Sequence, residues 1–351
     1  MRVLAFGTYE RRYPRNAQVI SALRGTGVEV IERHVSVWDG REHKFAAGAG
    51  SVAKLAVAEA RLAVRRPSPA FDVVLVGYPG HADLAAARLA ARGRPVVFNP
   101  LLSLWDTLVQ DRGRFKPRSP AARALRRLDR AAFRAADLVV ADTEQQAELF
   151  RELGARRVEV CFVGAEERLF KPGWRGGERF LFVGKLIPLH GLETILAAAR
   201  LVPELRINLV GSGQQQLLLQ RDRPRNVDWT AWLAYEQLPA VLRGSKAALG
   251  IFGTSAKAAR VIPNKAFQAL ATGAPLVTAD TPAARELLVD GESALLVPRG
   301  DPEALADALR RLAADDELAR RLSVGGQAVY QDRASELVLG RRWRTLLEGL
   351  L

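Results

Sequence analysis

The chain has 351 residues, of which 48% are hydrophobic, and it carries 52 Lys and Arg against 38 Asp and Glu, a net charge of +14. This length exceeds the usual size of a single core, so we expect two domains of about 150 to 180 residues. The single cysteine, Cys161, excludes an internal disulfide and a cysteine-based zinc site, and its apolar neighbours predict a buried thiol. The basic excess favours an acidic partner such as a nucleotide, a phospholipid or a nucleic acid.

The N-terminal segment MRVLAFG is predicted to form a first strand and not a signal peptide, because no apolar stretch of sufficient length follows Arg2. No segment approaches the roughly 18 apolar residues that a membrane-spanning helix needs. We therefore expect a cytoplasmic protein, and leave open a peripheral contact with the inner face of a membrane.

Strand-like and helix-like segments alternate through the first half of the chain. Apolar runs predict strands at 3–6, 28–33, 73–76, 96–98, 138–141 and 158–162. Apolar residues at helical spacing predict helices at 16–24, 51–64, 82–91, 119–136 and 145–153. This alternation is typical of βα units and predicts a doubly wound α/β domain.

A cluster of proline and glycine residues interrupts this pattern and predicts a linker at 169–177. The alternation resumes with strands at 180–183, 206–210, 247–251 and 276–278 and helices at 192–202, 263–271 and 302–314. A final helix at 335–351 has an apolar face of Trp343, Leu346, Leu347 and Leu350, which should dock on a domain. We expect domains at 1–168 and 178–334.

Three segments of the second half together have the features of an anion site. Two predicted strands end in glycine-containing turns, one of them followed by a lysine, and a predicted helix starts with free backbone amides and a second lysine. Parallel strands would bring all three to one edge of the sheet. For Lys185 alone, an ordinary turn with a solvated lysine is an equal alternative. The residues concerned are Gly184, Lys185, Gly211, Gly213, Pro263, Asn264 and Lys265.

Polar residues also follow the strands of the first half. His81 lies after a buried strand and is the first candidate for a catalytic group, with a packed structural histidine as an equal alternative. Arg15, in the loop after the first strand, is placed to reach a phosphate, although a solvent-facing arginine is the more common outcome. A third group follows the strand at 96–98 and could face a crevice on the acceptor side or form a satisfied polar network: Ser103, Asp106, Asp111 and Arg112.

The segment 112–134 contains nine basic residues and a single acid, Asp129. Leu125, Leu128 and Ala132 are expected to form a narrow apolar stripe with arginines around it. Such a helix could lie on anionic lipid, where each basic side chain contributes about 1 kcal/mol. An ordinary solvated helix is the simpler alternative.

Several motifs occur in a specific order in the second half: Val183-Gly184-Lys185-Leu186, His190-Gly191, Val210-Gly211-Ser212-Gly213, 260–286, Val289-Asp290-Gly291-Glu292 and 300–305. In this order they resemble the donor half of retaining glycosyltransferases of the GT4 family (glycosyl transferase group 1), which have the GT-B fold. The segment from Val163 to Pro172 also resembles the linker of that family. The resemblance is close over most of the second half and loose over the first.

The resemblance implies two Rossmann-like, doubly wound α/β domains facing across a cleft, with the C-terminal helix at 335–351 crossing back to the first. It implies metal-independent, retaining, hexosyltransferase-like transfer from a nucleoside-diphosphate sugar to an acceptor hydroxyl in glycan or glycolipid assembly, without a cofactor. Gly184 and Lys185 would hold the diphosphate, together with amides near Pro263 and Asn264 and the side chain of Lys265. Stabilisation of the leaving nucleotide is then the main chemistry, with His81 and Asp106 as candidates beside Lys185.

Four features depart from the family pattern. The family usually has two glutamates eight positions apart, one near the donor sugar and one near the ribose, where this chain has Arg260 and Gln268. Gln268 can hydrogen-bond ribose hydroxyls through its amide, whereas Arg260 leaves open an acidic donor sugar or weak activity. His190 replaces a second basic residue, so its help to a phosphate depends on protonation; a structural loop histidine is the alternative. The family's histidine after the strand at 96–98 is absent.

Two other functions compete with sugar transfer. A GT-B protein that binds a nucleotide sugar without transferring it would explain Arg260 and Gln268. A nucleic-acid-binding protein would explain the charge, but 7% aromatic residues and the lack of a recognisable module argue against it. Trp229 and Trp232 could flank a nucleotide base, although burial in the core is the more common role for tryptophan.

Overall fold

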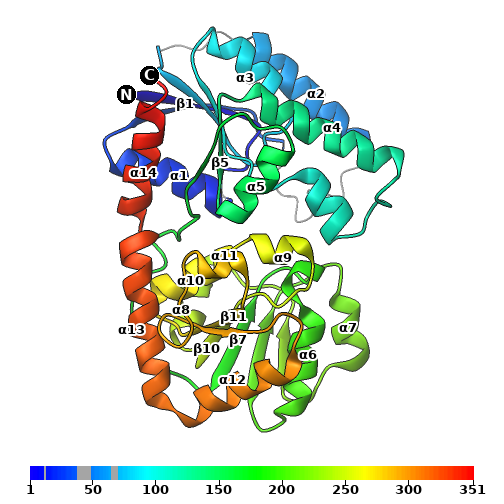
Figure 1. The fold of residues 1–351 in the computed structure, drawn as a ribbon, viewed down its shortest axis with the longest axis vertical. Coiled ribbons are helices and arrows are strands. Elements are labelled where there is room, and N and C mark those ends of the chain that lie inside the picture. Colours follow the sequence, from blue (N-terminus) through cyan, green and yellow to red (C-terminus); the bar gives the residue numbers. More distant parts are fainter. Residues whose placement is uncertain (12, 38–48, 65–69) are drawn as a thin grey trace. The chain divides into compact units, whose positions relative to one another are not determined.

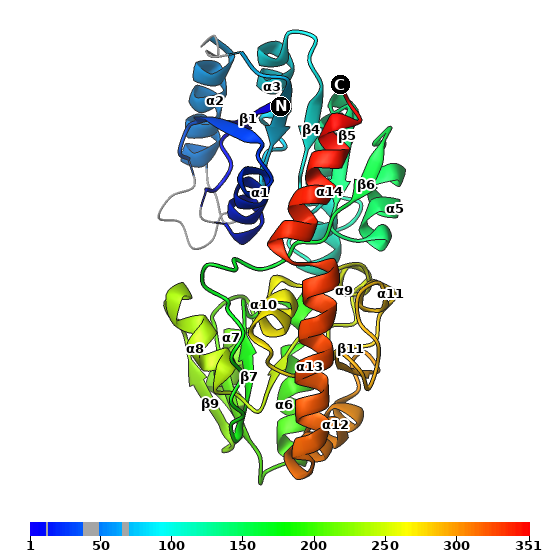
Figure 2. The same ribbon diagram turned by 90° about the vertical axis from the view of Figure 1, so that its left-hand side faces the viewer.

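The structure is a computed structural model that describes residues 1–11, 13–37, 49–64 and 70–351 (Figures 1 and 2). The chain divides into two compact units. The first comprises Met1–Val109, Phe115–Phe162 and Glu336–Leu351, and the second comprises Gln110–Arg114 and Val163–Ser335. Each unit is built on its own parallel sheet.

The first unit contains a six-stranded parallel sheet in the order β2-β1-β3-β4-β5-β6. Its central strands β3, β4 and β5 are buried along their whole length, which is why they read as continuous apolar runs. The predicted strands are confirmed, with ends that shift by one or two residues. They are β1 (Arg2–Gly7), β2 (Glu29–His34), β3 (Val73–Val76), β4 (Val96–Phe98), β5 (Leu138–Ala141) and β6 (Val158–Val160).

Helices cover both faces of this sheet, and all the helices predicted in the first half are present. Side-chain oxygens of Ser119 and Thr143 cap two of them by accepting from Ala122 N and Gln146 N. A short π-helical segment, Asp106–Asp111, was not predicted. The helices of the unit are α1 (Pro14–Gly25), α2 (Ala49–Val64), α3 (Leu84–Ala91), α4 (Pro120–Ala135), α5 (Glu144–Glu152) and α14 (Glu336–Glu348).

The basic helix α4 buries a different face from the predicted one. Ala122, Asp129, Ala132 and Phe133 are buried, whereas Leu128 is 40% exposed. The predicted stripe through Leu125 and Leu128 is therefore wrong in phase, because a buried acid, Asp129, lies at the centre of the packed face. Among the residues that the structure describes, no helix is long and apolar enough to span a bilayer.

The second unit also has a six-stranded parallel sheet, in the order β12-β11-β10-β7-β8-β9. The strand order reverses between β7 and β10, and open α/β sheets bind ligands at the carboxyl ends of the strands beside such a reversal. The edge strand β12 was not predicted. The strands are β7 (Arg179–Val183), β8 (Arg206–Val210), β9 (Val227–Thr230), β10 (Ala247–Leu249), β11 (Leu276–Ala279) and β12 (Leu295–Val297).

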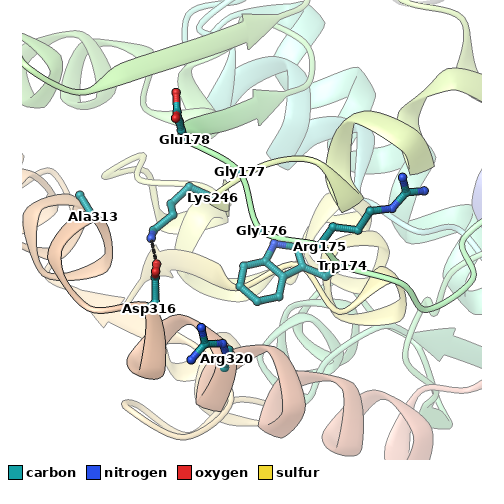
Figure 3. Close-up of a pocket in the computed structure, with 9 residues that line it drawn as sticks. All are labelled: Trp174, Arg175, Gly176, Gly177, Glu178, Lys246, Ala313, Asp316 and Arg320. Carbon is teal, nitrogen blue, oxygen red and sulfur yellow. Dashed lines mark hydrogen bonds and ion pairs between the residues drawn. The ribbon is translucent and has the colours of Figure 1, made fainter.

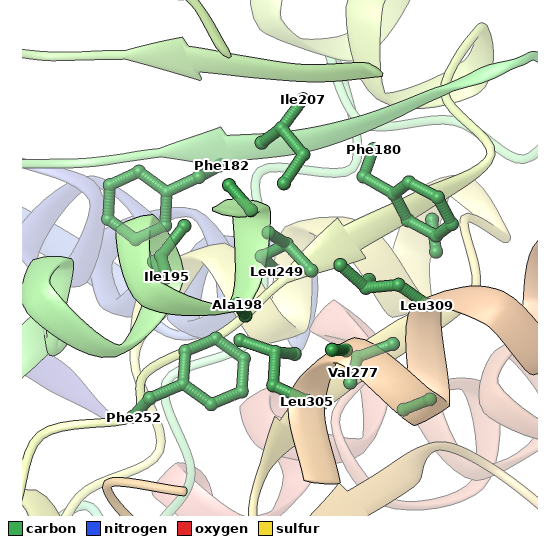
Figure 4. Close-up of a cluster of buried hydrophobic side chains, with 14 of the residues drawn as sticks. Phe180, Phe182, Ile195, Ala198, Ile207, Leu249, Phe252, Val277, Leu305 and Leu309 are labelled. Carbon is green, nitrogen blue, oxygen red and sulfur yellow. The ribbon is translucent and has the colours of Figure 1, made fainter. Parts of the chain in front are cut away.

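Phenylalanines of β7 organise the core of the second unit. Phe180 and Phe182 pack with Leu249 of β10 and Val277 of β11 against helices on one face of the sheet (Figure 4). The helices are α6 (Leu192–Leu201), α7 (Gln216–Asp222), α8 (Leu238–Arg243), α9 (Ala256–Arg260), α10 (Asn264–Thr272), α11 (Pro282–Arg285), α12 (Pro302–Ala314) and α13 (Asp316–Arg333).

The capping residues Thr281 and Pro282 indicate the start of α11, but the sequence missed four other helices of this unit, α7, α8, α9 and α13. The first three have seven residues or fewer, too short to establish an apolar period. In α13, Gly325 and Gly326 weaken the helical pattern. A Cβ at Gly325 would lie 2.2 Å from the carbonyl oxygen of Glu292, so close packing of the helix explains that glycine.

The C-terminal helix α14 packs on α1 of the first unit (Figure 1). A Cβ at Gly340 would lie 2.4 Å from the carbonyl oxygen of Ala22, which shows how closely the two helices approach. Trp343, Leu346 and Leu347 are buried in the core between helix and sheet. Because α13 belongs to the second unit, the prediction that the end of the chain returns to the first is confirmed.

Candidate functional site

The loops after β7 and β8 lie against each other at the carboxyl edge of the second sheet. Gly184 N donates to the carbonyl oxygen of Val210, and Leu186 N donates to that of Ser212, both at 2.9 Å. A Cβ at Gly211 would lie only 1.9 Å from the carbonyl oxygen of Gly184. Glycine at this position is therefore explained by the contact between the two backbones. A direct contact of Gly211 or Gly213 with a ligand stays a prediction.

Gly184 brings two of the predicted site residues together. Its backbone has a φ of +156°, and a Cβ there would lie 2.7 Å from Lys265 Nζ and 3.0 Å from His190 Cε1. The end of β7, the following turn and the start of α10 thus meet at one point. This is the convergence that the spacing of the motifs predicted.

Lys265 is the most unusual residue of this edge. Its Nζ is shielded from solvent and has no hydrogen-bond acceptor among the described residues. It lies 3.6 Å from the centroid of the Phe182 ring. Burial lowers the pKa of Lys265 well below its ordinary value. An unpaired buried ammonium costs several kcal/mol, so an anion placed here would relieve an unfavourable arrangement.

His190 is buried beside this lysine and holds the loop. Its Nδ1 hydrogen-bonds to the carbonyl oxygen of Lys185, and its ring packs edge-on to Phe182 at 5.6 Å. Burial, and then the charge of Lys265, keep the pKa of His190 well below its ordinary value. The ring is therefore neutral near pH 7, so help to a phosphate that depends on its protonation is not expected there. The structural loop histidine is the alternative that the geometry supports.

The other predicted residues of this edge surround the same point. The side chain of Lys185 is exposed, and Pro263 and Asn264 are half-buried where α10 begins. Pro263 has extended backbone angles and immediately precedes the helix. The helix therefore begins at Asn264, one residue later than predicted. Arg260 is the half-buried last residue of α9.

Gln268 lies one turn further along α10 and contacts a residue that the sequence did not single out. Its Nε2 donates to the Tyr235 hydroxyl at 3.3 Å. Burial, and then the charge of Glu166, raise the pKa of Tyr235; the Glu166 carboxylate pairs with Arg168 at 2.8 Å. Tyr235 comes from a segment without periodicity, and only the folded chain reveals its position.

Comparison with known proteins gives the family. Residues 1–165 match the model of the glycosyl transferase 4-like domain, and residues 177–315 match the model described as glycosyl transferases group 1. The chain belongs to the group 1 (GT4-like) glycosyltransferases. No curated protein sequence matches it.

Solved structures show the same GT-B fold. Sucrose-phosphate synthase from Thermosynechococcus elongatus has 16% identity and a TM-score of 0.76, over 99% of this chain and 98% of that one. HepE from Anabaena, in complex with UDP and glucose, has 15% identity and a TM-score of 0.70 over 100% of both chains. TarM from S. aureus has 11% identity and a TM-score of 0.62 over 78% of this chain and 55% of that one.

In the first unit of this glycosyltransferase, His81 and Ser103 belong to a buried network around Asp129. The Asp129 carboxylate accepts from Ser103 Oγ at 2.6 Å and from Trp105 N at 2.9 Å, and its Oδ1 lies 3.3 Å from His81 Nε2. The His81 ring packs edge-on against Phe98 at 5.1 Å. The catalytic prediction for His81 and the acceptor-side prediction for Ser103 are therefore corrected, because both side chains are shielded from any substrate.

Arg15 is a structural residue and does not reach for a phosphate. Its guanidinium is completely buried and donates to Asn99 Oδ1 at 3.0 Å and to the carbonyl oxygens of Cys161 and Phe162 at 3.0 and 2.7 Å. It also lies 5.9 Å from the ring of Trp343. Arg15 thus joins α1 to the ends of β4 and β6 and to α14. The neighbouring Cys161 is buried as predicted, and burial raises the pKa of its thiol to about 11.

Replacing Arg15 by Met should destabilise the first unit by about 3 kcal/mol, because it leaves buried acceptors without donors. Urea unfolding measures this loss. Arg11→Met is the control, because Arg11 is an exposed arginine paired with Glu32 at 3.1 Å and should change stability by less than about 1 kcal/mol. Equal effects of the two variants would contradict the structural role of Arg15.

The remaining first-half candidates lie in different surroundings. Asp106 is completely buried, so it contacts no substrate in this conformation, and its catalytic prediction is corrected. Asp111 and Arg112 belong to the segment that groups with the second unit, where Asp111 Oδ1 accepts from Ser255 Oγ at 3.2 Å. Burial raises the pKa of Asp111, and the nearby charge of Lys257 opposes this effect.

The two tryptophans after β8 have different surroundings. Trp229 Nε1 donates to the carbonyl oxygen of Gly211 at 2.9 Å, and its ring packs on the core, so it supports the loop at the candidate site. Trp232 is 70% exposed, and the expectation of core burial is wrong for it.

A cavity of about 490 Å³ lies on the second unit, and its lining residues, drawn in Figure 3, include none of the predicted site residues. It is lined by residues that precede β7 and β10, including Trp174 and Lys246, and by Asp316 and Arg320 of α13. It therefore lies at the amino ends of the strands, where open α/β sheets rarely bind substrates. Lys246 Nζ is already paired with Asp316 at 2.5 Å. We place the candidate site at the carboxyl edge, beside Lys265.

Proposed function

We propose that this glycosyltransferase moves a sugar from a nucleoside-diphosphate sugar to the hydroxyl of a glycan or glycolipid acceptor, with retention and without a metal ion. The observation that carries the proposal is the buried Lys265 Nζ, which has no hydrogen-bond acceptor in the described part of the chain and lies beside Gly184 where β7 ends. We assign the donor to the second unit and the acceptor to the first. The complexes of HepE with UDP and with UDP-glucose support a UDP-sugar as the first donor to test.

The chemistry follows from the charges of this edge. Lys265, the exposed Lys185 and the amides at the start of α10 would bind the diphosphate and stabilise its charge as the bond to the anomeric carbon breaks. The acceptor hydroxyl would attack on the face from which the diphosphate leaves. The family has a glutamate where this chain has Arg260. The positive charge of Arg260 supports including, among the donors to test, nucleotide sugars whose sugar carries a carboxylate.

A lipid-linked acceptor is part of the proposal because of α4. Its arginines at 123, 126, 127, 130 and 134 are exposed, and each would contribute about 1 kcal/mol near an anionic surface. Peripheral binding to a membrane would then bring the protein to such an acceptor.

The transfer reaction itself is testable by proton NMR. We expect release of free nucleotide on addition of an acceptor, with an anomeric signal in the product that matches the configuration of the donor. An inverted product would contradict the retaining reaction. Nucleotide binding without transfer to any acceptor would favour the binding-only alternative, which Arg260 and Gln268 motivate.

The lowered pKa of Lys265 predicts opposite effects of pH on stability and on binding. In the unfolded chain this lysine keeps its proton up to about pH 10.4, whereas the folded, ligand-free protein releases it at lower pH. The unfolded state thus binds more protons in that window, and stability should rise with pH there. Affinity for a diphosphate should fall in the same window, because the anion binds the protonated amine.

Calorimetric titration with UDP-glucose between pH 7 and pH 9 measures this effect, because a diphosphate diester has no ionisation of its own in that range. The nearest titratable group is His190, whose pKa is also lowered, by burial and by the charges of Lys265, Lys257 and Arg112. Its contribution is confined to the acid side, where stability should fall as the pH drops below about 6.5. An affinity that rises between pH 7 and pH 9 would contradict the prediction.

A further inference from the structure

Two residues of the segment Gln110–Arg114 are hydrogen-bonded to the carboxyl edge of the second sheet. The Asp111 carboxylate accepts from Ser255 Oγ at 3.2 Å, and the backbone carbonyl oxygen of Arg112 accepts from Gln214 Nε2 at 3.1 Å. The segment comes from the part of the chain between β4 and α4, yet it groups with the second unit. The two contacts join residues that are 144 and 102 positions apart.

The order of the strands fixes where these two anchor points lie. Strand β7 has β10 on one side and β8 on the other. Ser255 follows β10 and Gln214 follows β8, so the anchor points flank the loop that follows β7. That loop carries Lys185. Asp111 and Arg112 therefore span the loop after β7, from the end of one neighbouring strand to the end of the other.

Both anchor points are fixed by the second unit itself. Ser255 is the N-cap of α9, and its side chain also accepts from a backbone amide of the first turn. Gln214 is held through the next residue, because Gln215 N donates to the carbonyl oxygen of Leu186 at 2.9 Å. The segment is thus attached to the turn that directly follows Lys185.

The positive charge of Arg112 acts on this loop. The Arg112 side chain is half-buried. Burial lowers the pKa of His190 most, and the charges of Lys265, Lys257 and Arg112 lower it further. Burial raises the pKa of Asp111, and the charges of Lys257 and Arg112 oppose this effect. Both effects agree with the contacts, which hold Arg112 within electrostatic reach of the loop after β7.

This position matters because the loop lacks a cation where the family pattern has one. His190 is neutral near pH 7, so among the residues of this edge Lys265 and Lys185 contribute charge but His190 does not. A guanidinium presents its donors in a planar fork that matches two oxygens of a phosphate, and it keeps its charge throughout the physiological pH range. Arg112 can therefore provide the missing charge at this loop.

We propose that Arg112 is a diphosphate-binding residue of the donor site, and that Asp111 positions it through the hydrogen bond to Ser255. This inference rests on the proposed nucleoside-diphosphate-sugar function. The charge that the family pattern places at position 190 is then supplied by a segment from a distant part of the chain. A role of Arg112 on the acceptor side, which the sequence suggested, is the alternative.

The first test measures binding of a nucleoside diphosphate without an acceptor. Calorimetry gives the dissociation constants of UDP, GDP, ADP and CDP for wild type, and the tightest of the four is then titrated into Arg112→Met and Arg112→Lys. We expect R112M to weaken binding by about 20-fold, because charge-assisted hydrogen bonds are lost. R112K keeps the charge without the fork, so its loss should be about fivefold.

Arg114→Met is the matched control. Arg114 belongs to the same segment, but its side chain is exposed. R114M removes the same charge, and solvent screening should limit the change in affinity to less than about twofold. Wild-type affinity in R112M, or an equal loss in R114M, would overturn the proposal. If R112M keeps its affinity for the nucleotide and raises KM for the acceptor, Arg112 belongs to the acceptor side.

Chemical modification provides a second test, on the unaltered protein. Phenylglyoxal reacts with arginine side chains, and peptide mass spectrometry follows the rate at each position. With the nucleotide at about ten times its dissociation constant, modification of Arg112 should slow by about tenfold, because only the unbound fraction reacts. Arg114 should react at the same rate with and without nucleotide. Unchanged modification of Arg112 in the presence of bound nucleotide would contradict the proposal.

A double-mutant cycle tests the role of Asp111. Asp111→Ala removes the acceptor for Ser255 and should weaken nucleotide binding by about fivefold. Asp111→Asn keeps an oxygen that can accept from Ser255 and should restore most of the affinity. Because Asp111 acts through Arg112, D111A should cause no further loss in the R112M background. Additive losses, or wild-type affinity in D111A, would show that Asp111 does not position Arg112.

The two levels of the argument fail in different ways. If wild type binds no nucleoside diphosphate, the proposed function is wrong and this inference fails with it. If wild type binds one and loses affinity in Lys265→Met, but R112M binds it as wild type does, only the inference about Arg112 and Asp111 is wrong.

Discussion

Replacing Lys265 by Met is expected to abolish binding of a nucleoside diphosphate and, at the same time, to stabilise the ligand-free protein. The two effects have one cause, a buried Nζ to which none of the described residues offers an acceptor. Met has a similar length and fills the space over Phe182 without a charge. Removing the ammonium should stabilise the folded protein by about 1–3 kcal/mol. Losing its charge-assisted hydrogen bonds to phosphate should weaken binding by roughly 100-fold.

Lys246→Met is the matched control. Lys246 is also largely buried and lies in the same unit, but its Nζ is paired with Asp316 at 2.5 Å. We expect K246M to leave nucleotide binding unchanged and to give no increase in stability. Melting temperatures without ligand and calorimetric titrations with UDP-glucose measure both effects. A Lys265→Met variant that is destabilised, or that binds as wild type does, would show that Lys265 has an ordinary structural role.

Gly211→Ala is expected to destabilise the second unit by about 3 kcal/mol or more, through a steric clash and a strained backbone. The Cβ would lie 1.9 Å from the carbonyl oxygen of Gly184, and the backbone at Gly211 has a φ of +145°. Because the clash falls on the residue that contacts Lys265, nucleotide affinity should also decrease in whatever fraction of the protein folds.

The control for this variant is Gly244→Ala. Gly244 has a φ of −97°, and a Cβ there would meet nothing closer than 3.5 Å. We expect a change in stability within about 0.5 kcal/mol. Urea unfolding followed by tryptophan fluorescence compares the two. Similar midpoints for G211A and G244A would contradict the close contact between the loops after β7 and β8.

The sequence predicted the donor-side edge better than the first-unit site because the two depend on different information. Gly184 and Lys265 are 81 residues apart, yet each is recognisable locally, one at the end of a strand and the other at the start of a helix. Parallel strands then bring them together without further information. The α/β alternation was predictable for the same reason, since it depends only on local apolar periodicity.

The first-unit candidates failed because their side chains are determined by long-range packing. Arg15 and His81 follow strands, as site residues often do, but their partners lie far away in the chain. Arg15 donates to carbonyl oxygens 146 and 147 residues later, and His81 meets Asp129 of α4. Nothing in the sequence distinguishes a polar residue that faces a ligand from one that satisfies a buried network.

Tyr235 shows the opposite failure, a neighbour of a predicted site residue that the sequence did not indicate. It begins a short 3-10 turn between β9 and α8, in a stretch without periodicity or a recognisable motif. Its partner, Gln268, lies 33 residues after it. The loss of an expected glutamate at position 268 was readable, but the contact of Gln268 with Tyr235 requires the folded chain.

The central claim is that the carboxyl edge of the second sheet binds a nucleoside-diphosphate sugar through Lys265. The most direct measurement is thermal stabilisation of wild type and Lys265→Met by a panel of UDP-, GDP-, ADP- and CDP-sugars, because a ligand that binds only the folded state raises the melting temperature. We predict that at least one nucleotide sugar stabilises wild type and that the same ligand leaves K265M unchanged. No stabilisation of wild type by any of them, or an equal shift in both proteins, would contradict the claim.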